Sequence, residues 1–228
     1  MPAALNIRKQ QERKVRDELI LSSANDLFAL HGYHHTTMQA IANEVGYSKG
    51  TIYQHYTCKE DVLAKLYLNC GLILLDSMTA IIASDLSIRM KIMMIASVFL
   101  NNAKDLPAIS SNVTLVKSPE FFSKLSQDHQ KEITAIDAQM LVKVISLFDD
   151  FSDFDCDKVK NATFGWWSMQ LGVQSILISG WDISALGFQS PEKSIFLSLN
   201  IFLDGLKIPE CSECKSWEYV QEQSQNII

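Results

Sequence analysis

Residues 32–59 read GYHHTTMQAIANEVGYSKGTIYQHYTCK, and this stretch decides how the first quarter of the chain folds. Gly32 can end a preceding helix, because glycine readily adopts the positive φ of a C′ position. Apolar residues then recur at the spacing of one helix face, at Met38, Ile41, Ala42 and Val45. Gly46 can end this second helix, and Ser48 can N-cap a third. The stretch therefore predicts two short helices joined by a tight turn.

The start of the Met38 helix offers two N-cap residues. Either Thr36 or Thr37 can accept hydrogen bonds from the first free amides. Thr36 is followed three residues later by Gln39, which fits a capping box. We therefore expect a capped helix to begin here.

The helix after Ser48 has an unusual surface. Ile52 and Tyr56 recur at i and i+4 and can face the core. Polar and basic residues then face outward, with Tyr53 at the edge, namely Lys49, Thr51, Gln54 and His55. Small, basic and aromatic hydrogen-bonding residues stand where a core helix would carry leucines. A helix-turn-helix lays such a second helix in the major groove of DNA.

The run Thr36-Thr37…Ile41-Ala42…Gly46-Tyr47-Ser48-Lys49-Gly50-Thr51-Ile52-Tyr53-Gln54-His55-Tyr56…Lys59-Glu60 resembles the DNA-binding signature of the TetR family of bacterial transcriptional regulators. The resemblance covers roughly the first 65 residues. It departs from the family pattern at Tyr47, Tyr56 and Cys58, and none of these changes removes a DNA-contacting group. The resemblance implies that Lys49, Gly50 and Thr51 contact bases. It also implies that phosphates are positioned by Thr37, Tyr47, Ser48, Tyr53, His55 and Lys59.

Charge is distributed unevenly along the 228 residues, whose formal net charge is −6. Residues 1–60 hold seven Lys or Arg and six Asp or Glu, whereas the remainder has a net charge of −7. Five of the seven cations lie in residues 8–16. A basic segment beside a helix-turn-helix is a natural phosphate-binding element, because neutralised phosphates release counterions. The alternative is a solvated, frayed terminus.

Periodicity elsewhere predicts an all-α protein of about nine helices. We expect an N-terminal three-helix helix-turn-helix domain over residues 1–60 and a larger helical ligand-binding and dimerisation domain over residues 61–228. Outside the quoted stretch, helices are predicted over residues 12–31, 59–84, 87–104, 107–116, 119–148, 158–179 and 191–206. Residues 149–157 are predicted to be a solvated acidic loop, and the tail after Pro209 to be polar and mobile.

The larger domain concentrates methionine and aromatic residues, which adapt to varied apolar ligands. We predict a small lipophilic effector, aromatic or cationic given the acidic body, close to Met94, Phe122, Met140 and Trp167. The alternative is that these residues are simply core. The family resemblance implies a homodimer through the last two long helices, where residues 165–180 offer small side chains and residues 195–203 a broad apolar face.

Other chemistry finds little support in the sequence. The five cysteines are an odd number and are predicted to be free thiols. Cys211 and Cys214 form a C-x-x-C pair that could bind a metal or act in redox sensing, or could be incidental. The histidines show no catalytic or metal-ligand spacing, and no cofactor is expected. With no signal peptide or membrane span predicted, we expect a cytoplasmic protein.

The sequence thus predicts a ligand-responsive regulator that binds double-stranded operator DNA, most simply a repressor released by its effector. Two alternatives remain at this point. One is a helical small-molecule-binding protein or enzyme with a vestigial DNA-binding head. The other is a redox or metal sensor that uses Cys211 and Cys214.

Overall fold

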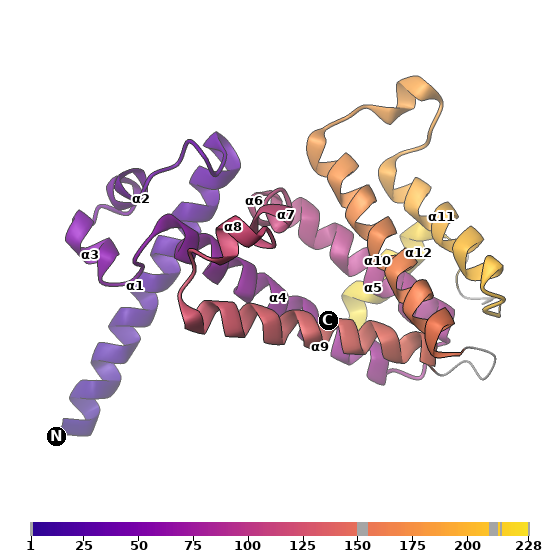
Figure 1. Ribbon diagram of the computed structural model, residues 1–228, viewed down its shortest axis with the longest axis horizontal. Helices are drawn as coiled ribbons and strands as arrows, with labels where there is room; N and C mark the ends of the chain where they lie inside the picture. Colours follow the sequence, from indigo (N-terminus) through magenta and orange to yellow (C-terminus); the bar gives the residue numbers. More distant parts are fainter. Residues whose placement is uncertain (1, 150–154, 210–213, 215, 228) are drawn as a thin grey trace. The chain divides into compact units, whose positions relative to one another are not determined.

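The computed structural model describes residues 2–149, 155–209, 214 and 216–227, and the regular structure of these residues is entirely helical (Figure 1). The chain forms two compact units. The first comprises Met1–Asn69 and Ser111–Ile133, and the second comprises Cys70–Ser110 and Thr134–Ile228. The domain boundary predicted at residue 60 therefore leaves out a later segment, residues 111–133, that packs with the N-terminal region.

The first unit contains five whole helices, which are α1 (Pro2–His31), α2 (Met38–Val45), α3 (Lys49–Tyr53), α7 (Val113–Val116) and α8 (Pro119–Phe122). The second contains α5 (Ile88–Asp105), α6 (Pro107–Ser110), α10 (Cys156–Ser179), the short 3-10 helix η1 (Ile183–Leu186), α11 (Pro191–Gly205) and α12 (Trp217–Ile227). Two helices begin in one unit and end in the other, namely α4 (Lys59–Ala83) and α9 (Gln127–Asp149). The chain therefore crosses from one unit to the other within α4 and again within α9.

The helix starts follow from local chemistry. A Ser or Asp side chain accepts a backbone amide hydrogen bond at the start of α5, α8, α10 and α11, where the caps are Ser87, Ser118, Asp155 and Ser190. Proline follows the cap in α8 and α11. Its fixed φ suits the first helical position, and its missing N–H costs nothing there.

Two predicted helices are interrupted. The helix expected over residues 107–116 is divided into α6 and α7, and the one expected over residues 119–148 is divided into α8 and α9. At the second break, Ser126 caps α9 by accepting the amide of His129 at 3.2 Å. Serine competes for backbone hydrogen bonds in this way, so it starts a new helix more readily than it continues an old one.

The prediction of a mobile polar tail is wrong for residues 217–227. They form α12, which packs on α5. Trp217, Val220 and Ser224 are buried at i, i+3 and i+7, while the rest of the helix is largely polar. This spacing is an amphipathic signal that could have been found in the sequence.

A buried arginine ties α5 to the end of α11. The Arg89 side chain is only 3% exposed, and it donates to the carbonyl oxygens of Ile208 and Pro209 at 2.8 and 3.0 Å. It also donates to Asn200 at 2.9 Å and forms an ion pair with Asp204. A buried guanidinium is stable only when its donors are used in this way.

By length and composition alone, α4 could cross a membrane. Half of the most apolar 18-residue stretch of α4 is buried within the chain, as in the core helix of a globular protein. Its first turn also carries Glu60 and Asp61, and Asp61 is an integral part of the first unit. We therefore treat α4 as a core helix.

Candidate nucleic-acid interface

The turn before α2 is built by two threonines with different roles. Thr37 is the N-cap, and its hydroxyl accepts the amide of Ala40 at 3.1 Å. Thr36 is buried and donates to the carbonyl oxygens of Leu27 and Gly32. The predicted capping box is wrong, because Gln39 bonds to Asn43 one turn further along the helix. The exposed Thr37 is left at the surface of the first unit.

The turn between α2 and α3 forms as predicted. Gly46 has φ of 70°, and its amide bonds back to the carbonyls of Ala42 and Asn43. Ser48 caps α3 by accepting the amide of Thr51 at 3.1 Å. Ile52 and Tyr56 are 0% and 4% exposed, so they fix α3 from behind. The geometry is that of a helix-turn-helix.

Most of the residues predicted to read DNA lie on the outer side of α3. Ser48, Lys49, Gly50 and Tyr53 are exposed, while Tyr47 and Thr51 are half-buried. The Lys49 ammonium lies 5.6 Å from the centroid of the Tyr53 ring. This cation–π contact orders a long side chain on an open surface. One side of α3 therefore presents the Lys49 ammonium, the Tyr53 phenol and the exposed backbone at Gly50.

His55 does not face outward, contrary to the prediction from helix spacing. Its side chain is 6% exposed, and its Nδ1 atom lies 3.0 Å from the Asp17 carboxylate on α1. The physical reason is that α3 ends at Tyr53, so His55 leaves the helical spiral and turns toward α1. Its role as a phosphate contact stays a prediction, but the observed contact holds α3 against α1.

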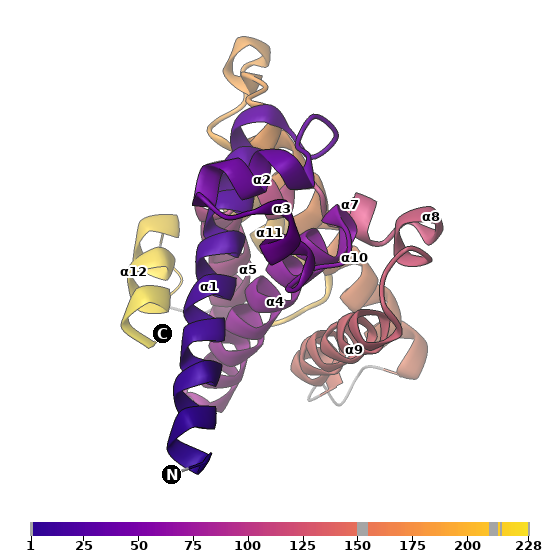
Figure 2. The same ribbon diagram turned by 90° about the vertical axis from the view of Figure 1, so that its left-hand side faces the viewer.

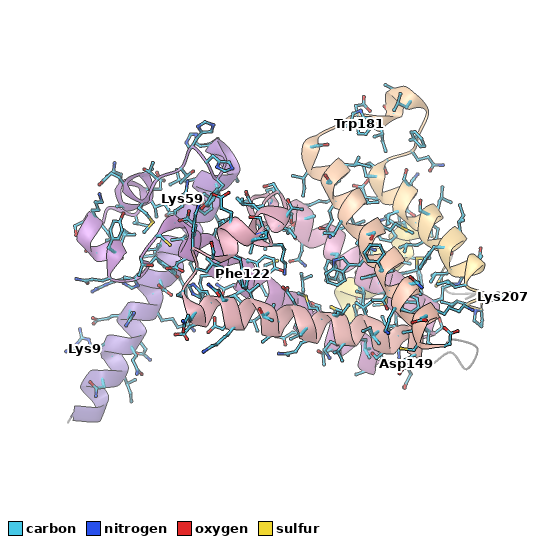
Figure 3. The ribbon with its side chains drawn as sticks, viewed as in Figure 1. Lys9, Lys59, Phe122, Asp149, Trp181 and Lys207 are labelled. Carbon is cyan, nitrogen blue, oxygen red and sulfur yellow. The ribbon has the colours of Figure 1, made fainter. Side chains whose placement is uncertain are left out.

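Lys59 also turns inward. Its ammonium donates to the carbonyl oxygens of Tyr33 and Thr36 at 2.7 and 2.8 Å and lies 4.2 Å from the centroid of the Tyr33 ring. Burial lowers the pKa of Lys59. These contacts hold the loop before α2 against the first turn of α4. The implied phosphate contact by Lys59, which is labelled in Figure 3, is untested, and its ammonium already donates to these two carbonyls.

A buried carboxylate that the sequence analysis did not single out supports this region. Asp61 is 4% exposed and accepts hydrogen bonds from Thr57, from the amide of Ser126 and from the ring of His129. Burial alone would raise the pKa of Asp61, but these hydrogen bonds outweigh it and the pKa is lowered. The only hint in the sequence is an acid in the first turn of a predicted helix.

Three of the four residues predicted to bind an effector lie in the second unit, and the fourth lies in the first. Met94 and Met140 are buried in the second unit, and Trp167 is half-buried there. The Trp167 ring lies 5.8 Å from that of Phe99 and 6.1 Å from that of Trp166. Phe122 lies on α8 in the first unit (Figure 3).

The second unit has an unexpectedly polar interior along α10. Its buried face includes Thr163, Gln170 and Gln174 beside Trp166. The hydroxyl of Thr163, the indole N–H of Trp166 and both polar atoms of the Gln170 amide have no hydrogen-bond partner among the described residues. Buried polar groups are normally paired, so this face is chemically unusual.

The C-x-x-C pair lies partly outside the described residues, which include Cys214 but not Cys211. The thiol of Cys214 lies 3.6 Å from the sulfur of Met90. In the part of the chain that the structure describes, no group of three or more potential metal ligands occurs. The metal or redox role remains an untested alternative.

Comparison with known proteins identifies the N-terminal region. Residues 20–66 match the model of the family described as bacterial regulatory proteins, tetR family. The chain is also 38% identical over 61 residues to the HTH-type transcriptional regulator TcmR of Streptomyces glaucescens. That match covers 27% of this chain and 26% of the relative, so it concerns the N-terminal region alone.

Solved structures extend the likeness to the whole fold. A tetR-family regulatory protein from Rhodococcus RHA1 has a TM-score of 0.64 at 22% identity, covering 85% of this chain and 98% of that one. FadR from Bacillus subtilis, solved with stearoyl-CoA, has a TM-score of 0.62 at 16% identity, with 82% and 98% covered. The ketosteroid regulator KstR2 of Mycobacterium tuberculosis has a TM-score of 0.60 at 18% identity, with 83% and 94% covered.

At these identities the structural likeness establishes the fold, and the match over residues 20–66 establishes the DNA-binding region. Residues 20–66 therefore belong to the tetR family of bacterial regulatory proteins, and the chain as a whole has the fold of solved structures from that family.

Proposed function

We propose that the protein is a cytoplasmic repressor that binds operator DNA as a homodimer and is released by a small effector. The observation that carries the DNA-binding part is the outer side of α3, where Lys49, Gly50 and Tyr53 are exposed on a helix fixed from behind by Ile52 and Tyr56. Base contacts by Lys49, Gly50 and Thr51 would specify sequence. Thr37, Tyr47, Ser48 and Tyr53 would position the phosphates.

Footprinting on the DNA that flanks the protein's own gene tests this proposal. We expect a protected, near-palindromic site with half-sites about one DNA turn or more apart. Binding should weaken steeply with salt, because phosphate contacts release counterions. Failure to protect any duplex sequence, with the protein folded and at micromolar concentration, would overturn the proposal.

The dimer is supported by apolar surface on α10 and α11, which run side by side in the second unit (Figure 1). Within the predicted face of residues 195–203, Ile195, Leu199 and Leu203 do not supply it, because they are fully buried within one chain. The outer faces instead carry Phe164 and Ile201, each 74% exposed, with Leu171 and Leu197 beside them. Apolar surface of this kind marks protein–protein contacts.

A charge at Ile201 should separate the subunits and, as a consequence, abolish operator binding. The reason is that an operator with two half-sites requires two helix-turn-helix domains held together in one dimer. The matched control is Val142→Glu on α9, where the valine is 63% exposed. We expect Ile201→Glu to be monomeric by sedimentation and Val142→Glu to remain dimeric. A monomeric unaltered protein would contradict the dimer.

The effector is proposed to bind in the second unit, close to Met94, Met140 and Trp167. The unpaired polar atoms of Thr163, Trp166 and Gln170 support a ligand that is not purely apolar. The side-chain amide of Gln170 has one group that donates and one that accepts a hydrogen bond. The effector would therefore carry both an acceptor and a donor on an apolar body about the size of an aromatic ring. Phe122 belongs to the other unit and does not contribute to this proposal.

Gln170→Leu separates ligand recognition from a purely structural role. Removing an unpaired buried amide should raise the stability of the ligand-free protein by about 1 kcal/mol or more. If Gln170 recognises the effector, the same variant should bind the operator normally but no longer be released by the inducing compound. A variant that is destabilised and still responds normally would contradict the assignment.

Release requires the effector to bind better to a form that does not fit the operator. The shift is limited to the difference in affinity, typically about 1–3 kcal/mol. Operator DNA must then weaken effector binding by the same factor. Equal effector affinity with and without operator, measured by tryptophan fluorescence, would remove the proposed switch.

A further inference from the structure

The first half of α1 extends beyond the core of its unit. The buried residues of α1 begin only at Ile20, and residues 6–16 are exposed throughout. Both ribbon views show this part of the helix projecting past α2 and α3 (Figures 1 and 2). Lys9 lies on the projecting part (Figure 3). Core packing therefore does not explain the composition of residues 6–16, and their charge becomes the informative property.

The cations of this segment fall into two sets. Lys9, Arg13 and Arg16 recur at i, i+4 and i+7, on the side of the helix that continues into Ile20. Arg8 and Lys14 point elsewhere and pair with Glu12 and Glu18 at 3.0 and 3.8 Å, each at the i, i+4 spacing. No ion pair of the first set occurs within the described residues.

The first set lines a groove that reaches the end of the recognition helix. The groove encloses about 360 Å³ and is lined by Lys9, Glu12, Arg13, Arg16, Gln54 and His55. Glu12 is the only carboxylate among these residues, and Arg8 already pairs with it. Gln54 is the C-cap of α3 and is exposed. The groove is therefore basic and continuous with the surface that faces DNA.

The positive surface has a defined boundary. A second groove of about 270 Å³ shares Arg13 and His55 with the first, but its other charged residues are one cation, Lys65, and three carboxylates, Asp17, Asp128 and Glu132. The Asp17–His55 contact lies where the charge changes sign. An extended polyanion would therefore follow the first groove and be repelled from the second.

We propose that the groove lined by Lys9, Arg13 and Arg16 binds DNA phosphates just outside the bases read by α3. The projecting half of α1 is then a second phosphate-binding element, and this inference rests on the proposed operator binding. From Lys9 to Arg16 the helix rises about 10 Å. One DNA strand presents about three phosphates over that length.

The test compares two double variants that remove the same charge from the same helix. Arg13→Gln/Arg16→Gln removes two cations that line the groove, and Arg8→Gln/Lys14→Gln removes two cations that do not line it. All four positions are exposed and glutamine is a good helix former, so both variants should keep the unaltered melting temperature and helix content. Binding is measured on the footprinted duplex over a range of salt concentrations.

We expect the groove variant to lower the slope of log affinity against log salt by about 1.8, or about 0.9 for each lost phosphate contact. The control variant should change the slope by much less. On a duplex trimmed to the half-sites, the unaltered protein and the groove variant should bind more nearly alike, because the outer phosphates are absent.

Equal slopes for the two variants would overturn the inference and leave operator binding intact. If the unaltered protein bound no duplex, both the inference and the proposed function would fail. Binding to phosphatidylglycerol vesicles that is lost only in the groove variant, with unchanged DNA affinity, would assign the groove to a membrane surface instead.

Discussion

Asp61 and His129 lie 68 residues apart in the sequence, yet Oδ1 of Asp61 is 2.9 Å from Nδ1 of His129. The same carboxylate accepts hydrogen bonds from the Thr57 hydroxyl and from the amide of Ser126 at 3.3 Å. One buried group therefore joins the start of α4, which directly follows the recognition turn, to the start of α9. The charge also lies near the positive end of the α4 dipole, which favours its ionised form.

Asp61→Asn should destabilise the first unit by about 1–3 kcal/mol, because an amide cannot accept all the hydrogen bonds that the carboxylate receives. Urea unfolding measures the change. Asp128→Asn is the control, since Asp128 is an exposed carboxylate close by on α9. Equal loss of stability in both variants would show that the hydrogen bonds of Asp61 do not account for the loss.

The lowered pKa of Asp61 also predicts an acid dependence. A carboxylate whose pKa is lower in the folded protein stabilises that protein fully above its ordinary pKa of about 4. The stabilisation is lost as the pH falls through the lowered value. Stability measured from pH 6 down to pH 2 should therefore fall less steeply for Asp61→Asn than for the unaltered protein. Parallel curves would count against the assignment.

His55→Ala distinguishes a structural contact from a phosphate contact. If His55 only holds α3 against Asp17 of α1, the variant should lose about 1 kcal/mol of stability. The salt dependence of its DNA binding should then be unchanged. A slope lowered by about 0.9 would instead support the phosphate contact implied by the family resemblance.

Lys59→Met should lower stability by about 1–3 kcal/mol, because the carbonyls of Tyr33 and Thr36 lose a charged donor in a half-buried place. Lys49→Met, at an exposed lysine of the same unit, should change stability by no more than about 0.5 kcal/mol. Thermal unfolding of the two variants gives the comparison. Similar melting temperatures would restore Lys59 as a candidate DNA contact.

Lys49→Ala should cost about 1–3 kcal/mol on the operator and relax its sequence preference, because Lys49 is proposed to contact bases. Tyr53→Phe should weaken binding to all sequences about equally, since a phosphate contact carries no sequence information. Affinities for the operator and for a scrambled duplex measure both effects. An unchanged footprint and affinity for Lys49→Ala would remove it from the interface.

Several structural features were predictable because they depend on neighbours in sequence. The glycine stops at Gly32 and Gly46 follow from the positive φ that glycine adopts, and the cap at Ser48 follows from its hydroxyl. The inward positions of Ile52 and Tyr56 follow from helical spacing. The same spacing wrongly predicted that His55 faces outward. Periodicity is informative only while the helix continues, and α3 ends two residues before His55.

By itself, the sequence determined the helical class, the helix-turn-helix and the outward residues of α3, because caps, glycine stops and apolar spacing act within a few residues. Only the tertiary structure decided which cations are free and which are already used. Lys59 pairs with loop carbonyls, Arg89 with the end of α11, and Arg13 and Arg16 line an open groove. The reason is physical: a charge is solvated, paired or available according to groups brought near it by packing, and residues such as Asp61 and His129 meet only after the chain has folded.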